Sequence, residues 1–419
     1  MKKKFVWLIL LSLAAVIIAV SCAGTPPPPA QTVTSGTSPA PPVSAPPPST
    51  APDQSALNSL NVAVARAEAA RKLAGDFDAA SFFPPDWESA ESLFSQAEQQ
   101  KDTSTQNGVQ ESAARYTRAA EAYEALIDKT YAPYYEKKAI ELNDARFAAV
   151  NAGAEELVPD FLLAADNVFD DADEKYQAKD YNGARSSADD ALSMYLALKD
   201  GIEAYRLREE IAERAEELVP YVLLQADTVG LDAIEKWNVK DYSGARLGAA
   251  EALAMFAALK AARDAYDVRE KIADRAEEFF YNSLWQADNV AFDAIDKWEA
   301  EDYAGARDAA RTAWIMYLNV AASTERQTAL DLKADAAVRQ EFNSAESIYN
   351  QANAAYLEQS YEEAAPLYEK CLLIFRMASQ LTLEKQRAAE DAMRRADQRT
   401  AESYEAARNA EAILQGGVK

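Results

Sequence analysis

A seven-residue motif recurs three times in this sequence at intervals of 61 residues. It reads KDYNGAR at 179–185, KDYSGAR at 240–246 and EDYAGAR at 301–307. Other columns keep the same register: Asp166, Asp227 and Asp288; Val168, Val229 and Val290; Met194, Met255 and Met316. Identity at so many fixed offsets indicates internal duplication, which restricts the chain to an architecture of repeated units that pack on their neighbours.

The spacing of apolar residues predicts two helices in each unit. In PDFLLAADNVFDDADEKYQA, which begins at Pro159, apolar residues recur every three to four positions and so share one helix face. This helix ends near Lys179. Asp180 then suits the N-cap of a second helix, because its carboxylate can accept the backbone N–H of Gly183. The second helix presents a small-residue face closed by Tyr195, which predicts an antiparallel hairpin.

The apolar spacing of the second helix continues to about Val219, which predicts a helix about 60 Å long at 1.5 Å per residue. Pro159 and Pro220 begin successive units, and proline is tolerated in a first turn. Tyr281 begins the next unit. The sequence therefore leaves open whether the helix breaks or only kinks at these junctions.

Weaker copies flank the three central units. One runs from Phe342 as FNSAESIYNQANAAYLEQSYEEAAPLYEKCLLIF, and the other begins at Trp87 as WESAESLFSQAEQ. We therefore expect an all-α fold, an elongated array of about five antiparallel helical hairpins with long connecting helices. The stretch from about Leu381 to Leu414 predicts one more helix, which either caps the last repeat or forms a coiled pair with another chain.

The amino terminus has the layout of a signal peptide. Three lysines precede an apolar stretch from Phe5 to Val20, which is slightly short for a spanning helix. The stretch ends in AVSC, with small residues before Cys22, and resembles a bacterial lipobox. The resemblance implies cleavage and acylation of Cys22, and Ala23 after it favours an outer-membrane anchor facing the periplasm. An uncleaved anchor, an ordinary secretory signal and surface display are the alternatives.

A second resemblance covers the carboxy-terminal hairpin. The pattern A-x3-Y-x4-Y-x2-A-x3-Y-x2-C, from Ala352 to Cys371, resembles a tetratricopeptide repeat. The central units differ from that family in period, 61 residues against about 34, so only the hairpin is shared. Together with the lipobox and a Pro-rich tether, the helices are similar to alanine-rich bacterial lipoproteins without an assigned activity. This resemblance implies an envelope location and helical packing.

These observations divide the chain into six segments. They are a signal peptide at 1–21, the lipidated cysteine and a disordered Pro-rich linker at 22–54, an N-terminal helical repeat region at 55–155, three 61-residue repeats at 156–339, a tetratricopeptide-like hairpin at 340–380, and a C-terminal capping helix at 381–419.

Composition argues against several classes of function. The formal net charge of −25 opposes binding to nucleic acids and to anionic lipid surfaces. The absence of histidine excludes Ser-His-Asp and Cys-His catalysis and histidine-ligated zinc. Cys371 aligns with alanines and is interpreted as a small buried residue. We therefore expect no enzyme, no catalytic residue, no cofactor and no bound metal.

Two sets of charged residues remain as candidates. Asp166, Asp170 and Glu174 share one helix face and could hold Ca²⁺ loosely, although a solvated polar face is the favoured interpretation. Arg185, Arg246 and Arg307 could grip carboxylates of a partner protein. The alternative is structural pairing with the local acids Asp180, Asp241 and Asp302, because an arginine near a helix start opposes the helix dipole. Trp285 either lines a pocket or is simply a larger core residue.

The function expected from these features is a non-catalytic scaffold or adaptor, anchored in the envelope through its lipid and bound to another envelope protein. The alternatives are a structural spacer and a solute-binding accessory subunit of a transporter. A buried cavity with convergent polar groups would favour the last of these.

Overall fold

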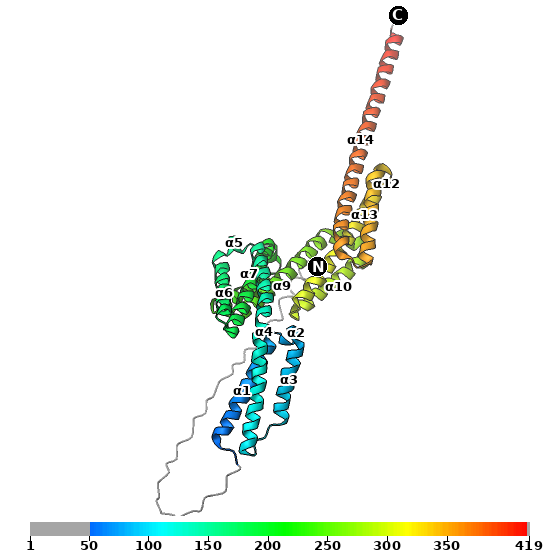
Figure 1. The fold of residues 1–419 in the computed structure, drawn as a ribbon. Coiled ribbons are helices and arrows are strands. Elements are labelled where there is room, and N and C mark those ends of the chain that lie inside the picture. Colours follow the sequence, from blue (N-terminus) through cyan, green and yellow to red (C-terminus); the bar gives the residue numbers. More distant parts are fainter. Residues whose placement is uncertain (1–50, 417–419) are drawn as a thin grey trace, which may run out of the picture.

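The structure is a computed structural model that describes residues 51–416, with side chains up to residue 412. The predicted signal peptide, Cys22 and nearly all of the predicted linker lie outside the described residues. Fourteen α-helices and no strand make up the described part, which confirms the all-α prediction. The helices form an elongated array from which the last helix projects (Figure 1).

Five antiparallel hairpins follow one another along the chain, as predicted. In each, a short first helix packs on a long second helix. The pairs are α3 (Pro84–Gln99) with α4 (Gln106–Ala152), α6 (Pro159–Gln177) with α7 (Tyr181–Leu218), α8 (Pro220–Asn238) with α9 (Tyr242–Phe279), α10 (Tyr281–Glu299) with α11 (Tyr303–Asp331), and α13 (Arg339–Leu357) with α14 (Tyr361–Gly416).

The long second helices form the spine of the array. Helix α1 (Gln54–Asp76) packs on α4, and contacts then run from α4 to α7, α7 to α9, α9 to α11 and α11 to α14. Three short helices sit at junctions between hairpins: α2 (Ala79–Phe82), α5 (Ala154–Leu157) and α12 (Ala334–Ala337). Each hairpin therefore contacts its sequence neighbours, as expected of a repeat array.

The helix breaks at every junction instead of kinking, which answers the question that the prolines left open. Val219, before Pro220, has φ −142° and ψ 53°, outside the helical region. Phe280 has nearly the same conformation, φ −133° and ψ 33°, although Tyr281 follows it. Phe280 packs against the hydrophobic core. Proline is therefore not required for this break.

The hairpin turn has the predicted cap. Asp241 accepts a hydrogen bond from the backbone N–H of Gly244 at 2.9 Å, and Asp180 and Asp302 cap their helices in the same way. A Cβ atom on Gly244 would lie 2.1 Å from the Asp241 carboxylate, so the motif needs glycine for this close approach. Lys240, just before the cap, takes a positive φ of 64° to reverse the chain.

The carboxy-terminal stretch differs from the prediction. The predicted boundary between residues 380 and 381 falls inside α14, so this stretch is the continuation of the last hairpin helix and not an additional helix. Lys385 and Gln386 still donate to backbone carbonyls near α12. From residue 383 to residue 412 every side chain is exposed, and Figure 1 shows this part of α14 extending away from the array.

Candidate functional site

Five arginine–carboxylate pairs, here called the junction ion pairs, join successive hairpins. In each, an arginine on a long helix or on α1 binds an acid on the first helix of the next hairpin, 19 or 20 residues later, through both Nε and Nη2. They are Arg71–Glu91, Arg146–Asp166, Arg208–Asp227, Arg269–Asp288 and Arg326–Glu346.

The junction ion pairs are partly buried, since the acid side chains are only 20–29% exposed. Two-pronged arginine–carboxylate contacts are directional and stronger than typical surface pairs. The hydrogen bonds from Arg146 hold the pKa of Asp166 below its usual range. The pKa of Glu91 is lowered in the same way by Arg71. These two carboxylates therefore stay ionised at neutral pH and serve as anchors, not as proton donors.

A tyrosine from the following long helix completes three of the five pairs. The hydroxyls of Tyr123, Tyr195 and Tyr317 donate to Glu91, Asp166 and Asp288 at 2.6, 2.6 and 2.7 Å. Phe256 and Phe375 occupy the corresponding places at the other two pairs, 29 residues after the acid. Sequence reasoning missed these triads. The available signal was the repeat register, because Arg208 and Arg269 are 61 residues apart and Tyr195 and Tyr317 are 122 residues, two repeats, apart.

The three predicted arginines do not share one environment. Arg185 forms an ion pair with Asp76 of α1 at 3.1 Å, so in the first unit it ties the array to the N-terminal helices. Arg307 pairs with its neighbour Asp308 at 2.8 Å. Arg246 is exposed and has no hydrogen bond or ion pair among the described residues. The acids expected to pair with these arginines accept hydrogen bonds from backbone N–H groups of glycines instead, as N-caps. They are Asp180, Asp241 and Asp302.

Other sequence candidates have clear positions. Asp166 is held by Arg146 and Tyr195, so it is not available to the acidic row proposed for Ca²⁺. Within the described part, no group of three or more His, Cys, Asp or Glu side chains could hold a metal ion. Cys371 is buried, which raises the pKa of its thiol to about 11. Trp285 is 56% exposed, which corrects the interpretation of it as a core residue.

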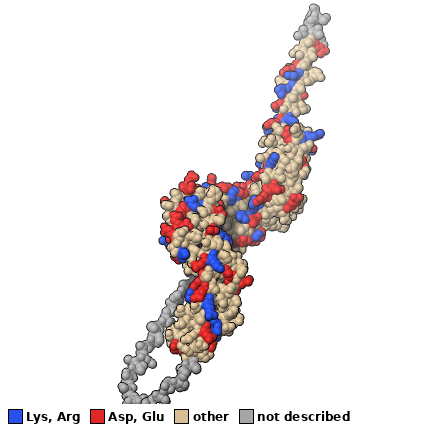
Figure 2. Space-filling view, viewed as in Figure 1, with Lys and Arg blue, Asp and Glu red and all other residues tan. Residues whose placement is uncertain are grey.

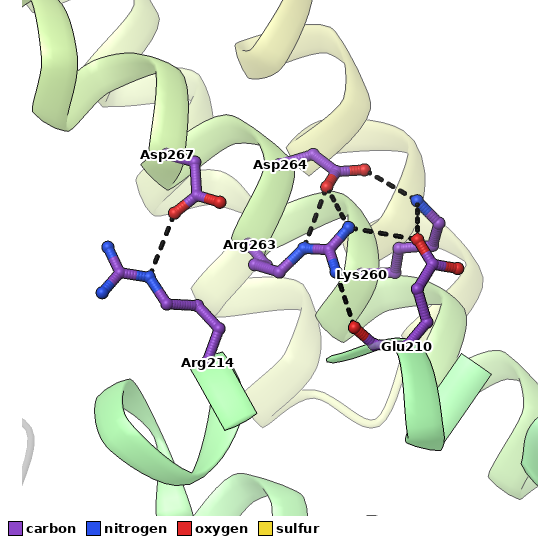
Figure 3. Close-up of polar contacts among 6 residues, drawn as sticks. All are labelled: Glu210, Arg214, Lys260, Arg263, Asp264 and Asp267. Carbon is purple, nitrogen blue, oxygen red and sulfur yellow. Dashed lines mark hydrogen bonds and ion pairs between the residues drawn. The ribbon is translucent and has the colours of Figure 1, made fainter. Parts of the chain in front are cut away.

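A second charged cluster joins α7 and α9 (Figure 3). Glu210 accepts from Lys260 and Arg263, and Arg263 also binds Asp264. Arg214, which lies on α7 like Glu210, binds Asp267 of α9 at 3.1 Å. The pKa of Glu210 is lowered, mainly by its hydrogen bond from Lys260. This network holds two long helices together and leaves its cations paired, so it is a structural contact.

The most distinctive surface lies on the first helices of the three central hairpins. Their inward positions match: Leu162, Leu223 and Leu284; Ala165, Ala226 and Ala287; Ala172, Ala233 and Ala294, all buried. Their outward positions differ: Asp160, Tyr221 and Asn282; Leu163, Leu224 and Trp285; Asp170, Leu231 and Phe292; Asp173, Ile234 and Ile295.

Helices α8 and α10 therefore carry apolar side chains where α6 is mostly acidic. We call these positions, Tyr221, Leu224, Leu231 and Ile234 of α8 with Trp285, Phe292 and Ile295 of α10, the outward faces. Their side chains are between 43% and 71% exposed. Because α6 forms the same hairpin with aspartate at three of the four positions, and with the exposed Leu163 at the fourth, the fold does not require apolar residues at those three. Large exposed apolar patches of this kind mark contact surfaces.

Carboxylates lie within the outward faces. Glu235 of α8 and Asp296 of α10 are exposed and have no ion pair among the described residues. Asp232 and Asp293 bind Lys236 and Lys297 one turn later at 2.7 and 2.9 Å. Figure 2 shows acidic side chains gathered around the middle of the array on the face in view. The surface therefore combines apolar contact area with negative charge.

Two hollows on the described surface are open to solvent. One, of about 290 Å³, lies beside Asp53 and Gln106, and the other, of about 510 Å³, is lined by Arg311, Glu362 and their neighbours. Most of the residues that line each hollow are charged or polar. Neither is the enclosed cavity that a solute-binding role would favour. None of the described helices is both long and apolar enough to cross a membrane.

Comparison of the chain with models of known protein families, with curated proteins and with solved structures finds no match.

Exchanging tyrosine and phenylalanine at the junction ion pairs tests the triads. Tyr195→Phe removes a hydrogen bond to an ionised acceptor, so we expect α7 to lose about 1–2 kcal/mol of protection in hydrogen exchange. Phe256→Tyr places a hydroxyl near Asp227 in a site built like that of Tyr195, and we expect α9 to gain up to about 1 kcal/mol. No change for Tyr195→Phe, or faster exchange of α9 for Phe256→Tyr, would contradict this interpretation.

The junction ion pairs also predict a pH dependence. Because folding lowers the pKa of Asp166, its contribution to stability is fully present above the unfolded-state pKa, about 4, and is lost as the pH falls through the folded-state pKa. We expect Asp166→Asn to lower the urea midpoint at about pH 7 and the difference from wild type to narrow as the pH falls from about 4 to about 2. A difference independent of pH would show that the charge of Asp166 is not what matters.

Proposed function

We propose that this protein is a lipid-anchored helical-repeat scaffold of the bacterial envelope that binds another envelope protein without catalysing a reaction. In this proposal, acylated Cys22 holds the chain at the outer membrane, on the periplasmic side, and the Pro-rich linker carries the array away from the lipid surface. The strongly acidic composition supports a protein partner over a nucleic acid.

The observation that carries this proposal is the difference between the outward faces of α8 and α10 and the matching surface of α6. The three helices bury the same residues but expose different ones. A chain that served only as a spacer would need no exposed apolar residues at these positions, and such residues add a risk of aggregation. Their occurrence in two successive units therefore favours protein binding over a structural spacer.

Photo-crosslinking in cells tests this function. A crosslinking amino acid at Leu231 or Ile295 should capture one discrete partner. The same amino acid at Asp170, the position of α6 that corresponds to Leu231, should capture far less. Equal capture at all three positions, or capture of abundant neighbours alone, would contradict a specific binding surface and favour the spacer.

A Cys22→Ser variant extends the same experiment to the anchor. The lipoprotein proposal predicts that this variant takes up no labelled palmitate, no longer fractionates with the outer membrane, and loses the crosslink at Leu231. If acylation and membrane fractionation survived the substitution, the anchor would have to lie elsewhere. If the crosslink alone survived, partner binding would be independent of the anchor.

A further inference from the structure

We propose that the segment bound by the outward faces is an amphipathic helix whose apolar stripe is flanked by lysine or arginine. This inference rests on the proposed binding function and specifies the chemistry of the partner. It is carried by the spacing of the exposed apolar residues and by the charges that lie among them.

The spacing on α8 fits a helical partner. Tyr221, Leu224 and Leu231 follow one another at intervals of three and seven residues, with Ile234 three residues further on, so they form one stripe along the helix. These side chains are exposed, whereas Leu223, Ala226 and Ala233 of the same helix are buried. It extends over about 20 Å at 1.5 Å per residue, close to four turns of a partner helix. Ridges of such side chains pack well against the grooves of a second helix.

The repeat register places the same stripe on α10. Trp285 and Ile295 correspond to Leu224 and Ile234, and both are about half exposed, 56% and 43%. The chain thus presents a similar surface on two successive hairpins, although α10 has Asn282 where α8 has Tyr221. A large aromatic residue at one of them is typical of the anchors that dominate protein interfaces.

Charge determines which kind of helix these faces favour. Glu235 directly follows Ile234 at the end of the α8 stripe, and Asp296 occupies the corresponding place on α10. Both are exposed and unpaired among the described residues. A helix with flanking lysines or arginines would pair with them, whereas an acidic helix would be repelled. The same argument disfavours the outward face of a second copy and an anionic lipid surface, which are also negative.

The test uses the full-length protein in detergent and two synthetic peptides of about 20 residues, long enough to span the stripe. Both form amphipathic helices with the same leucine stripe, and one is flanked by lysine and the other by glutamate. We expect the lysine peptide to bind at least about tenfold more tightly, with an affinity that falls as salt is added. Equal binding of the two peptides, or tighter binding of the glutamate peptide, would overturn the inference.

The variant for this test replaces apolar residues of α8 and α10 with the aspartates that α6 has at the corresponding positions. Leu231→Asp/Ile234→Asp/Ile295→Asp places on α8 and α10 the aspartates that α6 carries as Asp170 and Asp173. We expect it to abolish binding of the lysine peptide and to keep the helical content. The matched control, Leu357→Asp/Leu373→Asp, makes the same type of change at side chains that are 80% and 59% exposed outside the outward faces. It should bind like wild type, and a loss of binding in the control would overturn the inference.

The other outcomes separate the inference from the proposed function. Binding of the unmodified protein to phosphatidylethanolamine–phosphatidylglycerol vesicles, lost in the aspartate variant, would assign the outward faces to lipid and overturn the inference. Failure of both peptides to bind, alongside a specific crosslink at Leu231 in cells, would reject the basic helix and keep the scaffold function. Loss of that crosslink, by contrast, would reject the scaffold function itself.

Discussion

The partly buried ion pair between one hairpin and the next is the interaction on which the array depends. The three central hairpins are joined by single non-helical residues, Val219 and Phe280, and short helices lie at the junctions with the outer hairpins. Such short breaks alone would leave the angle between hairpins poorly fixed. An arginine that holds a carboxylate with two nitrogens fixes orientation as well as distance. In three of the five pairs a buried tyrosine adds a third hydrogen bond from the following long helix.

The repeat therefore assigns different tasks to different sides of the first helices. Their inner side packs on the long helix of the same hairpin. The acid of the junction ion pair fixes the orientation of the first helix relative to the preceding hairpin, and the Asp–Gly cap closes the turn to the long helix. Their outer side is left to vary between units. That side is mostly acidic on α6 and mostly apolar on α8 and α10, where we propose that a partner binds. A solenoid-like array commonly separates shape from recognition in this way.

The sequence predicted the helices, the hairpins and the caps well, because the 61-residue register and the apolar spacing report on local structure. Asp180, Asp241 and Asp302 are where the capping rule expects them. The sequence did not predict the junction ion pairs, because the arginine and the acid lie on different helices. Whether they come into contact depends on the angle between those helices at the break. The exposure of Trp285 was missed for a related reason. An aromatic residue at helical spacing suggests a core, and only the packing identifies its outward side.

The most direct test of this account is a distance measurement across one junction. Spin labels at Glu235 of α8 and Asp296 of α10 report on the arrangement of two consecutive hairpins through pulsed electron resonance. The account predicts a single narrow distance distribution in the otherwise unmodified protein, and a clearly broader one after Arg269→Met, which removes the junction ion pair to Asp288. An equally narrow distribution in the Arg269→Met protein would contradict the central role given to these pairs.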